Sequence, residues 1–291
     1  MNNPLYPPYE VFVGRDLGGR DYRIEEDLID RFRRGTADDD PRYRQPDPDG
    51  RLLAPALLFH SEVYQDLSWY LPNLIGNLHA AQEWELFQPM FLGDKVRTRS
   101  TVVGRYRKRN RDYVVNEVLI TDEQGRWLQR SRTHQSFLAE HHDAGYVVDK
   151  ERERQPDRAV ESAAASGPLL APIEKTITLE MCQAFSGPHR NYHTDREMAQ
   201  ALGFPDVVVQ GMMSICFLSE MLSRNFGWGW FFGGKLEVKL INVVWPGDAL
   251  TIGGRVLEEA PEGGRRRAHL EVWCEKADGV RTVAGSASAL L

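Results

Sequence analysis

Two glycine-aspartate pairs, 154 positions apart, divide this 291-residue chain into halves that share one pattern. Gly93 and Gly247 are each followed by aspartate and then by a run of alternating apolar and polar residues. A second glycine turn follows in each half, at Gly125 and Gly279, and these positions are again 154 apart. Equal offsets at two landmarks predict an internal duplication, so each half must fold into the same unit.

The alternating runs predict antiparallel strands joined by glycine-bearing turns in both halves. Upstream of the strands of the second half, the segment Gly211–Ser223 is apolar on nearly every face, which predicts a buried helix ending near Gly227. Thr194–Glu197 has the spacing of a capping box and predicts the start of a short helix that stops at Gly203. The predicted class is α+β, with a sheet wrapped around a central helix in each half.

The composition changes once, near the middle of the chain. Residues 149–168 are charged, then small, and end in Gly-Pro, a composition with too few apolar side chains to pack. We therefore expect domains at 1–148 and 169–291, joined by a linker at 149–168.

Composition and charge exclude several classes of protein. The formal net charge of -6 argues against nucleic acid as the main partner, because phosphate binding needs a basic surplus. Three scattered cysteines without a CxxC pair indicate reduced thiols in a cytoplasmic protein and give no zinc site. No secretory signal or segment long enough to span a membrane is expected.

The most informative stretch of the sequence runs through the second half. Its informative segments are Phe185–Asp195, Met198-Ala199, Gly203–Pro205, Gln210–Met212 and Gly247-Asp248. Together they resemble the MaoC-like hot-dog hydratases and dehydratases, whose second-half pattern is roughly S-G-D-x-N-P-x-H, a short helix, and a glycine turn into a long helix. In the first half Thr36–Tyr43, Ala54-Pro55, Leu78–Glu83 and Gly93-Asp94 are similar to the fused, two-module members.

The resemblance implies a double hot-dog fold that adds or removes water across the α,β bond of an acyl thioester. It assigns acid-base chemistry to His193 and stabilisation of the thioester oxygen to the backbone N–H of Gly211. A histidine of near-neutral pKa suits either direction of proton transfer. A backbone donor at a helix N-terminus suits a developing oxyanion, and glycine lets the thioester approach closely. The first half is expected to be degenerate, a scaffold that shapes the acyl tunnel.

This sequence departs from the family pattern at the expected carboxylate. Pro188 stands five residues before His193, where active members usually have Asp, and proline cannot move a proton. In the first half Asp38 keeps the Asp position, but Tyr43 replaces the histidine. Three compensations are open, and they differ in the residue that assists. Asn191 could position the water while His193 does the proton work, His189 could assist, or Asp195 could orient His193; the first, with His189 assisting, is preferred.

The predicted substrate-binding residues surround this motif and the long helix: Arg190, Gln210, Met212, Trp228 and Trp230. Trp228 and Trp230 are expected in a loop that borders the acyl cavity. The substrate is expected on coenzyme A or phosphopantetheine, with no separate cofactor. No metal is expected, since the pair His141-His142 has no other ligands spaced around it.

Other conspicuous residues have structural explanations. Asp94 and Asp248 are expected to make turn hydrogen bonds, and His79 to lie at the interface between the halves. The basic run Arg105–Arg111 predicts a solvated hairpin, with contact to coenzyme A phosphates as the alternative.

Two other functions remain open from the sequence. A hot-dog thioesterase would use Gln210 or Glu220 near the central helix. A non-catalytic thioester-binding subunit would explain the missing Asp. The partner expected is an acyl-CoA or acyl-carrier-protein substrate. A hot-dog unit exposes a sheet edge, which the duplication can cover internally. The resemblance implies that such double hot-dogs can also pair into a homodimer.

Overall fold

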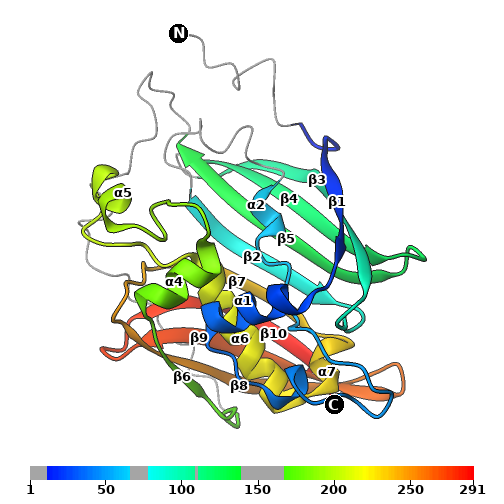
Figure 1. Cartoon of the computed structure of the whole chain (residues 1–291). Helices are drawn as coiled ribbons and strands as arrows, with labels where there is room; N and C mark the ends of the chain where they lie inside the picture. The colour runs from blue at the N-terminus through cyan, green and yellow to red at the C-terminus, as the bar shows by residue number, and fades with distance from the viewer. Residues whose placement is uncertain (1–11, 66–77, 109–110, 139–166) are drawn as a thin grey trace.

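The computed structural model describes residues 12–65, 78–108, 111–138 and 167–291 (Figure 1). Within these ranges, the first half contributes five strands and three helical segments. They are β1 (Asp16–Arg23), α1 (Glu26–Thr36), the 3-10 turn η1 (Pro41–Tyr43), α2 (Glu62–Gln65), β2 (Leu78–Leu86), β3 (Lys95–Lys108), β4 (Arg111–Asp122) and β5 (Trp127–Leu138).

The second half has a similar order of elements. Its elements are β6 (Ile173–Thr176), α4 (Leu179–Ser186), α5 (Arg196–Ala201), α6 (Gly211–Phe226), α7 (Trp228–Phe231), β7 (Lys235–Leu240), β8 (Ala249–Glu262), β9 (Arg265–Lys276) and β10 (Arg281–Leu290). All ten strands form one antiparallel sheet in the order β1-β3-β4-β5-β2-β7-β10-β9-β8-β6. Strands β2 and β7 pair at its centre, so the two five-stranded halves join edge to edge. The predicted α+β double hot-dog is confirmed.

The turns of the two halves contain equivalent hydrogen bonds. Asp94 accepts a hydrogen bond from the N–H of Phe91 at 2.8 Å, and Asp248 accepts one from the N–H of Trp245 at 2.9 Å. The glycine before each aspartate has a positive φ, 91° and 98°, which only glycine adopts without strain. The predicted turn role of both aspartates is confirmed.

Two irregularities in the strands also recur 154 positions apart. The β3–β4 pairing shifts register between Val102 and Gly104, and the β8–β9 pairing shifts between Val256 and Glu258. A bulge bends and twists a strand, so both long hairpins curl around their side of the core in the same way. The basic run Arg105–Arg111 lies at the end of the β3–β4 hairpin, as predicted, with residues 109–110 outside the described residues.

Helix α6 is the central helix of the second half and is buried from Met212 to Ser223 without interruption. It packs against β8, β9 and β10 and ends at Gly227, whose φ is 52°. The predicted buried helix and its stop are therefore confirmed. The predicted short helix is also present as α5, with Asp195 as its N-cap residue and Gly203, at φ 92°, just beyond its end.

The two halves also meet through helices α1 and α4, which pack side by side (Figure 1). Gly35 allows this contact, because a Cβ there would lie 2.9 Å from the Cα of Phe185. The ring of His60 stacks on the ring of Phe185, with the ring centres 3.8 Å apart. Its Nδ1 is buried and finds no hydrogen-bond partner among the described residues. Burial lowers the pKa of His60 to about 3, with the charge of Arg31 as a smaller cause.

Replacing His60 with Phe should make the protein less sensitive to acid. The folded His60 resists protonation, whereas the unfolded chain takes up a proton near pH 6.5, so the wild type loses stability as the pH falls below that value. The stability advantage of His60→Phe over the wild type should grow by about 2 kcal/mol between pH 7.5 and pH 5. Urea unfolding of both proteins at the two pH values measures this, and parallel pH dependences would contradict it.

Some predictions from the sequence fall on residues that the structure does not describe. Most of the predicted linker, 149–168, and the His141-His142 pair lie outside the described residues, so the domain boundaries stay a prediction.

Cys182, Cys216 and Cys274 are free and buried, as expected. None of the helices in the described part of the chain has the length and apolar character needed to cross a membrane.

Candidate active site

Asn191 organises the loop that follows α4. Its side-chain Oδ1 accepts a hydrogen bond from the N–H of His193 at 2.8 Å. Its Nδ2 donates to the carbonyl oxygens of Ser186 and His189, at 3.1 and 3.0 Å. Both amide hydrogens are therefore committed to the loop, and one lone pair of Oδ1 remains for another partner. This arrangement fixes the backbone that carries His193.

The imidazole of His193 is held in one tautomer. Its Nδ1 lies 2.7 Å from the carbonyl oxygen of Val208, which can only accept, so Nδ1 carries the proton and donates it. Nε2 is then the unprotonated nitrogen. The ring packs against Tyr192 with the ring centres 3.9 Å apart. Burial lowers the pKa of His193 to about 4, so the ring is a neutral base at physiological pH.

Gly211 is the first residue of α6, where backbone N–H groups lack helical partners and the helix dipole is positive. Gln210 is the N-cap residue, but its side chain makes no cap hydrogen bond and accepts instead from Ser186 Oγ at 3.4 Å. Only Val209 and Gln210 separate Gly211 from Val208, the partner of His193. The predicted base and the predicted oxyanion donor therefore lie at the same helix start.

Replacing Gly211 with Ala should destabilise the fold by crowding. A Cβ there would lie 1.9 Å from Leu240 Cδ2, the end of a flexible side chain that would have to move. We expect a loss of about 1–2 kcal/mol in the free energy of unfolding. The double variant with Leu240→Val, which lacks that methyl position, should recover most of the loss. Urea unfolding tests both, and a Gly211→Ala protein as stable as the wild type would contradict the expected clash.

The other predicted site residues differ in their exposure to solvent and in their partners. Met212 is fully buried in the core. His189 and Arg190 are exposed, and Arg190 forms ion pairs with Asp195 and Glu197 at 2.8 and 3.1 Å. Asp195 is thus occupied by Arg190 and by capping of α5, where it accepts from the N–H of Met198.

The two tryptophans lie beyond the other end of α6. The expected loop there is wrong, because Trp228–Phe231 forms the short helix α7. Trp230 is fully buried and donates from its indole nitrogen to Ser219 Oγ at 3.0 Å, whereas Trp228 is 43% exposed. The 16 residues of α6 separate them from Gly211, about 24 Å along the helix axis.

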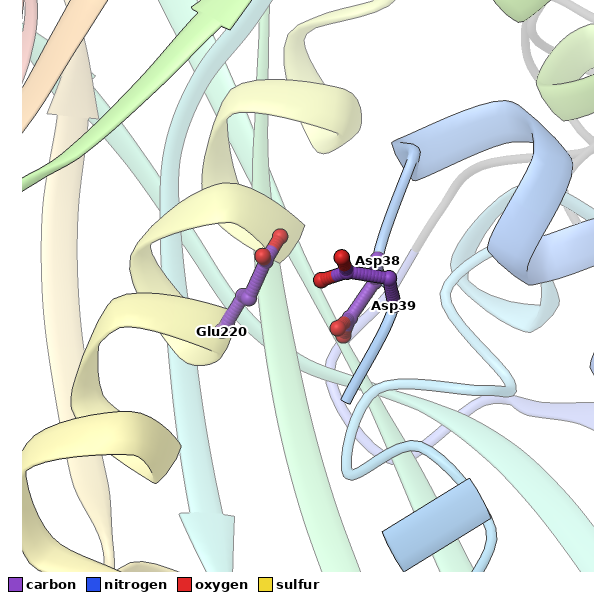
Figure 2. Close-up of side chains that lie close together, drawn as sticks. All are labelled: Asp38, Asp39 and Glu220. Atoms are coloured by element: carbon purple, nitrogen blue, oxygen red, sulfur yellow. The ribbon is translucent and has the colours of Figure 1, made fainter. Parts of the chain in front are cut away.

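The first-half copy of the motif packs against the middle of α6 (Figure 2). Asp38 and Asp39, just after α1, point toward Glu220 of α6, with carboxylate oxygens of the three within 4.8 Å of one another. Asp38 and Glu220 are buried, and burial raises the pKa of both, that of Glu220 to about 7.

Cations from the second half already neutralise this acidic cluster. Lys175 Nζ lies 2.7 Å from Glu220 Oε2 and donates to the carbonyl oxygen of Ala37 at 2.8 Å. Arg224 bridges Glu220 and Asp39, at 2.6 and 2.7 Å. A divalent cation would have to displace or face these charges, so the donor set fits an internal ion network. Glu220, considered above for thioester hydrolysis, is committed to that network.

Sequence reasoning missed Lys175 and Tyr64. Lys175 stands in an alternating strand pattern, and nothing nearby in the sequence signals its partner 45 positions later. His79 was expected at the interface between the halves, and it lies there on β2, with Tyr64 hydrogen-bonded to it.

The two halves of the chain match different family models. Residues 148–272 match the family model of the MaoC-like domain, and residues 11–130 match that of the FAS1-like dehydratase region. No curated protein sequence matches the chain.

Among solved structures, a MaoC-like dehydratase from Phytophthora capsici is 15% identical, with a TM-score of 0.72 over 97% of each chain. The peroxisomal multifunctional enzyme type 2 from Drosophila melanogaster is 17% identical, with a TM-score of 0.67; the match covers 94% of this chain and 48% of that one. A conserved hypothetical protein from Mycobacterium tuberculosis with a double hot-dog fold is 12% identical, with a TM-score of 0.64 over 96% of each chain. At these identities the likeness shows the fold. With the family models, which match each half separately, it identifies the chain as a double hot-dog protein with a MaoC-like domain in its second half and a FAS1-like dehydratase region in its first half.

Proposed function

We propose that this protein hydrates an enoyl thioester, or dehydrates the 3-hydroxyacyl thioester, at the start of α6. The observation that carries the proposal is the tautomer of His193. Its Nδ1 is committed to Val208, three residues before the first residue of α6, which leaves Nε2 as the unprotonated nitrogen. The substrate would be carried on coenzyme A or phosphopantetheine, with no separate cofactor.

The chemistry balances with one histidine. In hydration, Nε2 of His193 takes a proton from water while the water oxygen bonds to Cβ and the α,β double-bond electrons move toward the thioester. The resulting negative charge on the thioester oxygen is stabilised by the N–H of Gly211 and the helix dipole. His193 then returns the same proton to Cα. Dehydration is the reverse, and both directions leave the enzyme in its starting protonation state.

A panel of trans-2-enoyl-CoA and 3-hydroxyacyl-CoA thioesters of different chain lengths tests the proposal. We expect the absorbance of the conjugated enoyl thioester to fall on hydration, without release of free thiol. Thiol release, detected with a colorimetric reagent, would instead indicate a thioesterase. Tight binding of acyl-CoA without turnover of any substrate would indicate an accessory binding subunit and overturn the proposal.

A further inference from the structure

A chain of hydrogen bonds from the first half ends beside the start of α6. Tyr64, in α2, has its hydroxyl oxygen 2.7 Å from Nδ1 of His79. Nε2 of His79 lies 3.1 Å from Oε1 of Gln82, which is fully buried in β2. None of these residues belongs to the second-half motif, and the one-histidine chemistry above does not use them.

The surroundings of Gln82 fix the direction of every hydrogen bond in this chain. Its Nε2 donates to the carbonyl oxygen of Glu83 and to Ser131 Oγ, both at 3.0 Å. Because a carbonyl oxygen can only accept, the contact with Glu83 fixes which end of the amide is nitrogen. The other end, Oε1, accepts from the hydroxyl of Thr133 at 2.8 Å and faces His79. His79 must therefore donate from Nε2 to Gln82, which leaves Nδ1 as an acceptor.

The hydroxyl of Tyr64 consequently donates its hydrogen to His79. A phenol oxygen whose hydrogen is engaged offers only lone pairs to a further partner. The first half thus presents a hydrogen-bond acceptor with a fixed orientation, and burial further disfavours loss of the Tyr64 proton by raising its pKa.

This acceptor lies close to the proposed site. Nδ1 of His79 is 4.0 Å from the position that a Cβ on Gly211 would occupy. The hydroxyl oxygen of Tyr64, 2.7 Å from that nitrogen, is therefore within about 7 Å of the same position. Val208, the partner of His193, is three residues from Gly211, at most about 11 Å along an extended backbone. His193 and Tyr64 approach one helix start from the two halves.

We propose that Tyr64 is a further catalytic residue at this site and that His79 is its positioning residue. The inference rests on the proposed function. An attacking water must give one hydrogen to His193 and needs an acceptor for the other, so that its lone pair points at Cβ. The Tyr64 oxygen supplies that acceptor from the first half. No proton leaves Tyr64 in this step, so the proton balance given above is unchanged.

Tyr64→Phe removes the acceptor and keeps the ring. We expect kcat for hydration to fall about 10- to 100-fold, with KM for the enoyl-CoA within threefold of the wild type. His79→Gln should lower kcat similarly, because the Tyr64 hydroxyl loses its fixed orientation. The double variant should be no slower than Tyr64→Phe alone, since the two residues act as one unit.

The chain offers a matched control in the exposed Tyr106, whose phenol oxygen lies 3.1 Å from Nδ1 of His134. Tyr106→Phe should leave kcat unchanged, and melting temperatures check that all variants fold. A Tyr64→Phe enzyme with wild-type kcat, or additive losses in the double variant, would overturn the role of Tyr64 while the proposed function stands. A wild-type enzyme inactive toward the whole thioester panel would overturn both.

Discussion

Replacing Lys175 with Met should lower the free energy of unfolding by about 3–5 kcal/mol, the usual cost of removing one partner of a buried ion pair. Lys175 is 9% exposed and Glu220 only 2%. Burial and the charge of Asp38 already raise the pKa of Glu220 to about 7. Without the ammonium group, two buried carboxyl groups would share one region, with Arg224 left as the neighbouring cation at Glu220.

The penalty should depend on pH in a defined direction. A folded-state pKa above the unfolded value of 4.5 means that the folded carboxyl binds its proton first as the pH falls. Protonated Glu220 needs no cation, so the cost of Lys175→Met should shrink between pH 8 and pH 5. Urea unfolding at both pH values measures it.

Two further variants complete the test of this ion network. Lys175→Met combined with Glu220→Leu should recover much of the lost stability, because an apolar pair replaces the buried charges. Lys95→Met, which breaks the exposed pair of Lys95 with Glu123, should cost at most about 1 kcal/mol. Equal losses for Lys175→Met and Lys95→Met would show that the buried ion network contributes no more to the free energy of unfolding than a surface pair does.

Replacing His193 with Gln should lower kcat for hydration by about 10²- to 10⁴-fold, the usual contribution of a general base. Gln can still donate a hydrogen bond to Val208, so the loop should keep its fold and KM should change little. His269→Gln, at an exposed position on β9, is the matched control and should retain wild-type kcat. Unchanged turnover in His193→Gln would exclude this residue as the base.

The pH profile of the wild-type enzyme follows from the same histidine. Because burial lowers the pKa of His193 to about 4, the neutral base persists well below the ordinary histidine range. We expect kcat/KM to be level from pH 8 to about pH 5.5 and to fall as the pH approaches 4. A fall centred near pH 6.5 would contradict this assignment.

The parts of the fold that could be predicted are those with local signals. The turns at Gly93 and Gly247 and the end of α6 at Gly227 need positive φ angles, and this requirement is visible in the sequence as glycine. The all-round apolar character of Gly211–Ser223 likewise predicted burial directly.

The contacts that the sequence did not reveal join distant segments. Lys175 meets Ala37, and Asp38 meets Glu220, across more than 130 positions. The direction of the hydrogen bond from Tyr64 to His79 depends on Gln82 and Thr133, which come together only through the β2–β5 pairing. The glycines of the Trp-Gly-Trp segment predict a loop, but packing of Trp230 under α6 holds the segment as a helix turn.

The most direct test of a single site at the start of α6 is a crystal structure with a bound 3-hydroxyacyl-CoA or a non-reactive analogue. We expect Cβ within about 3–4 Å of Nε2 of His193 and the thioester oxygen at the N–H of Gly211. An acyl chain seated instead at Asp38 and Glu220, or with no proton-transferring group near Cβ, would contradict this expectation.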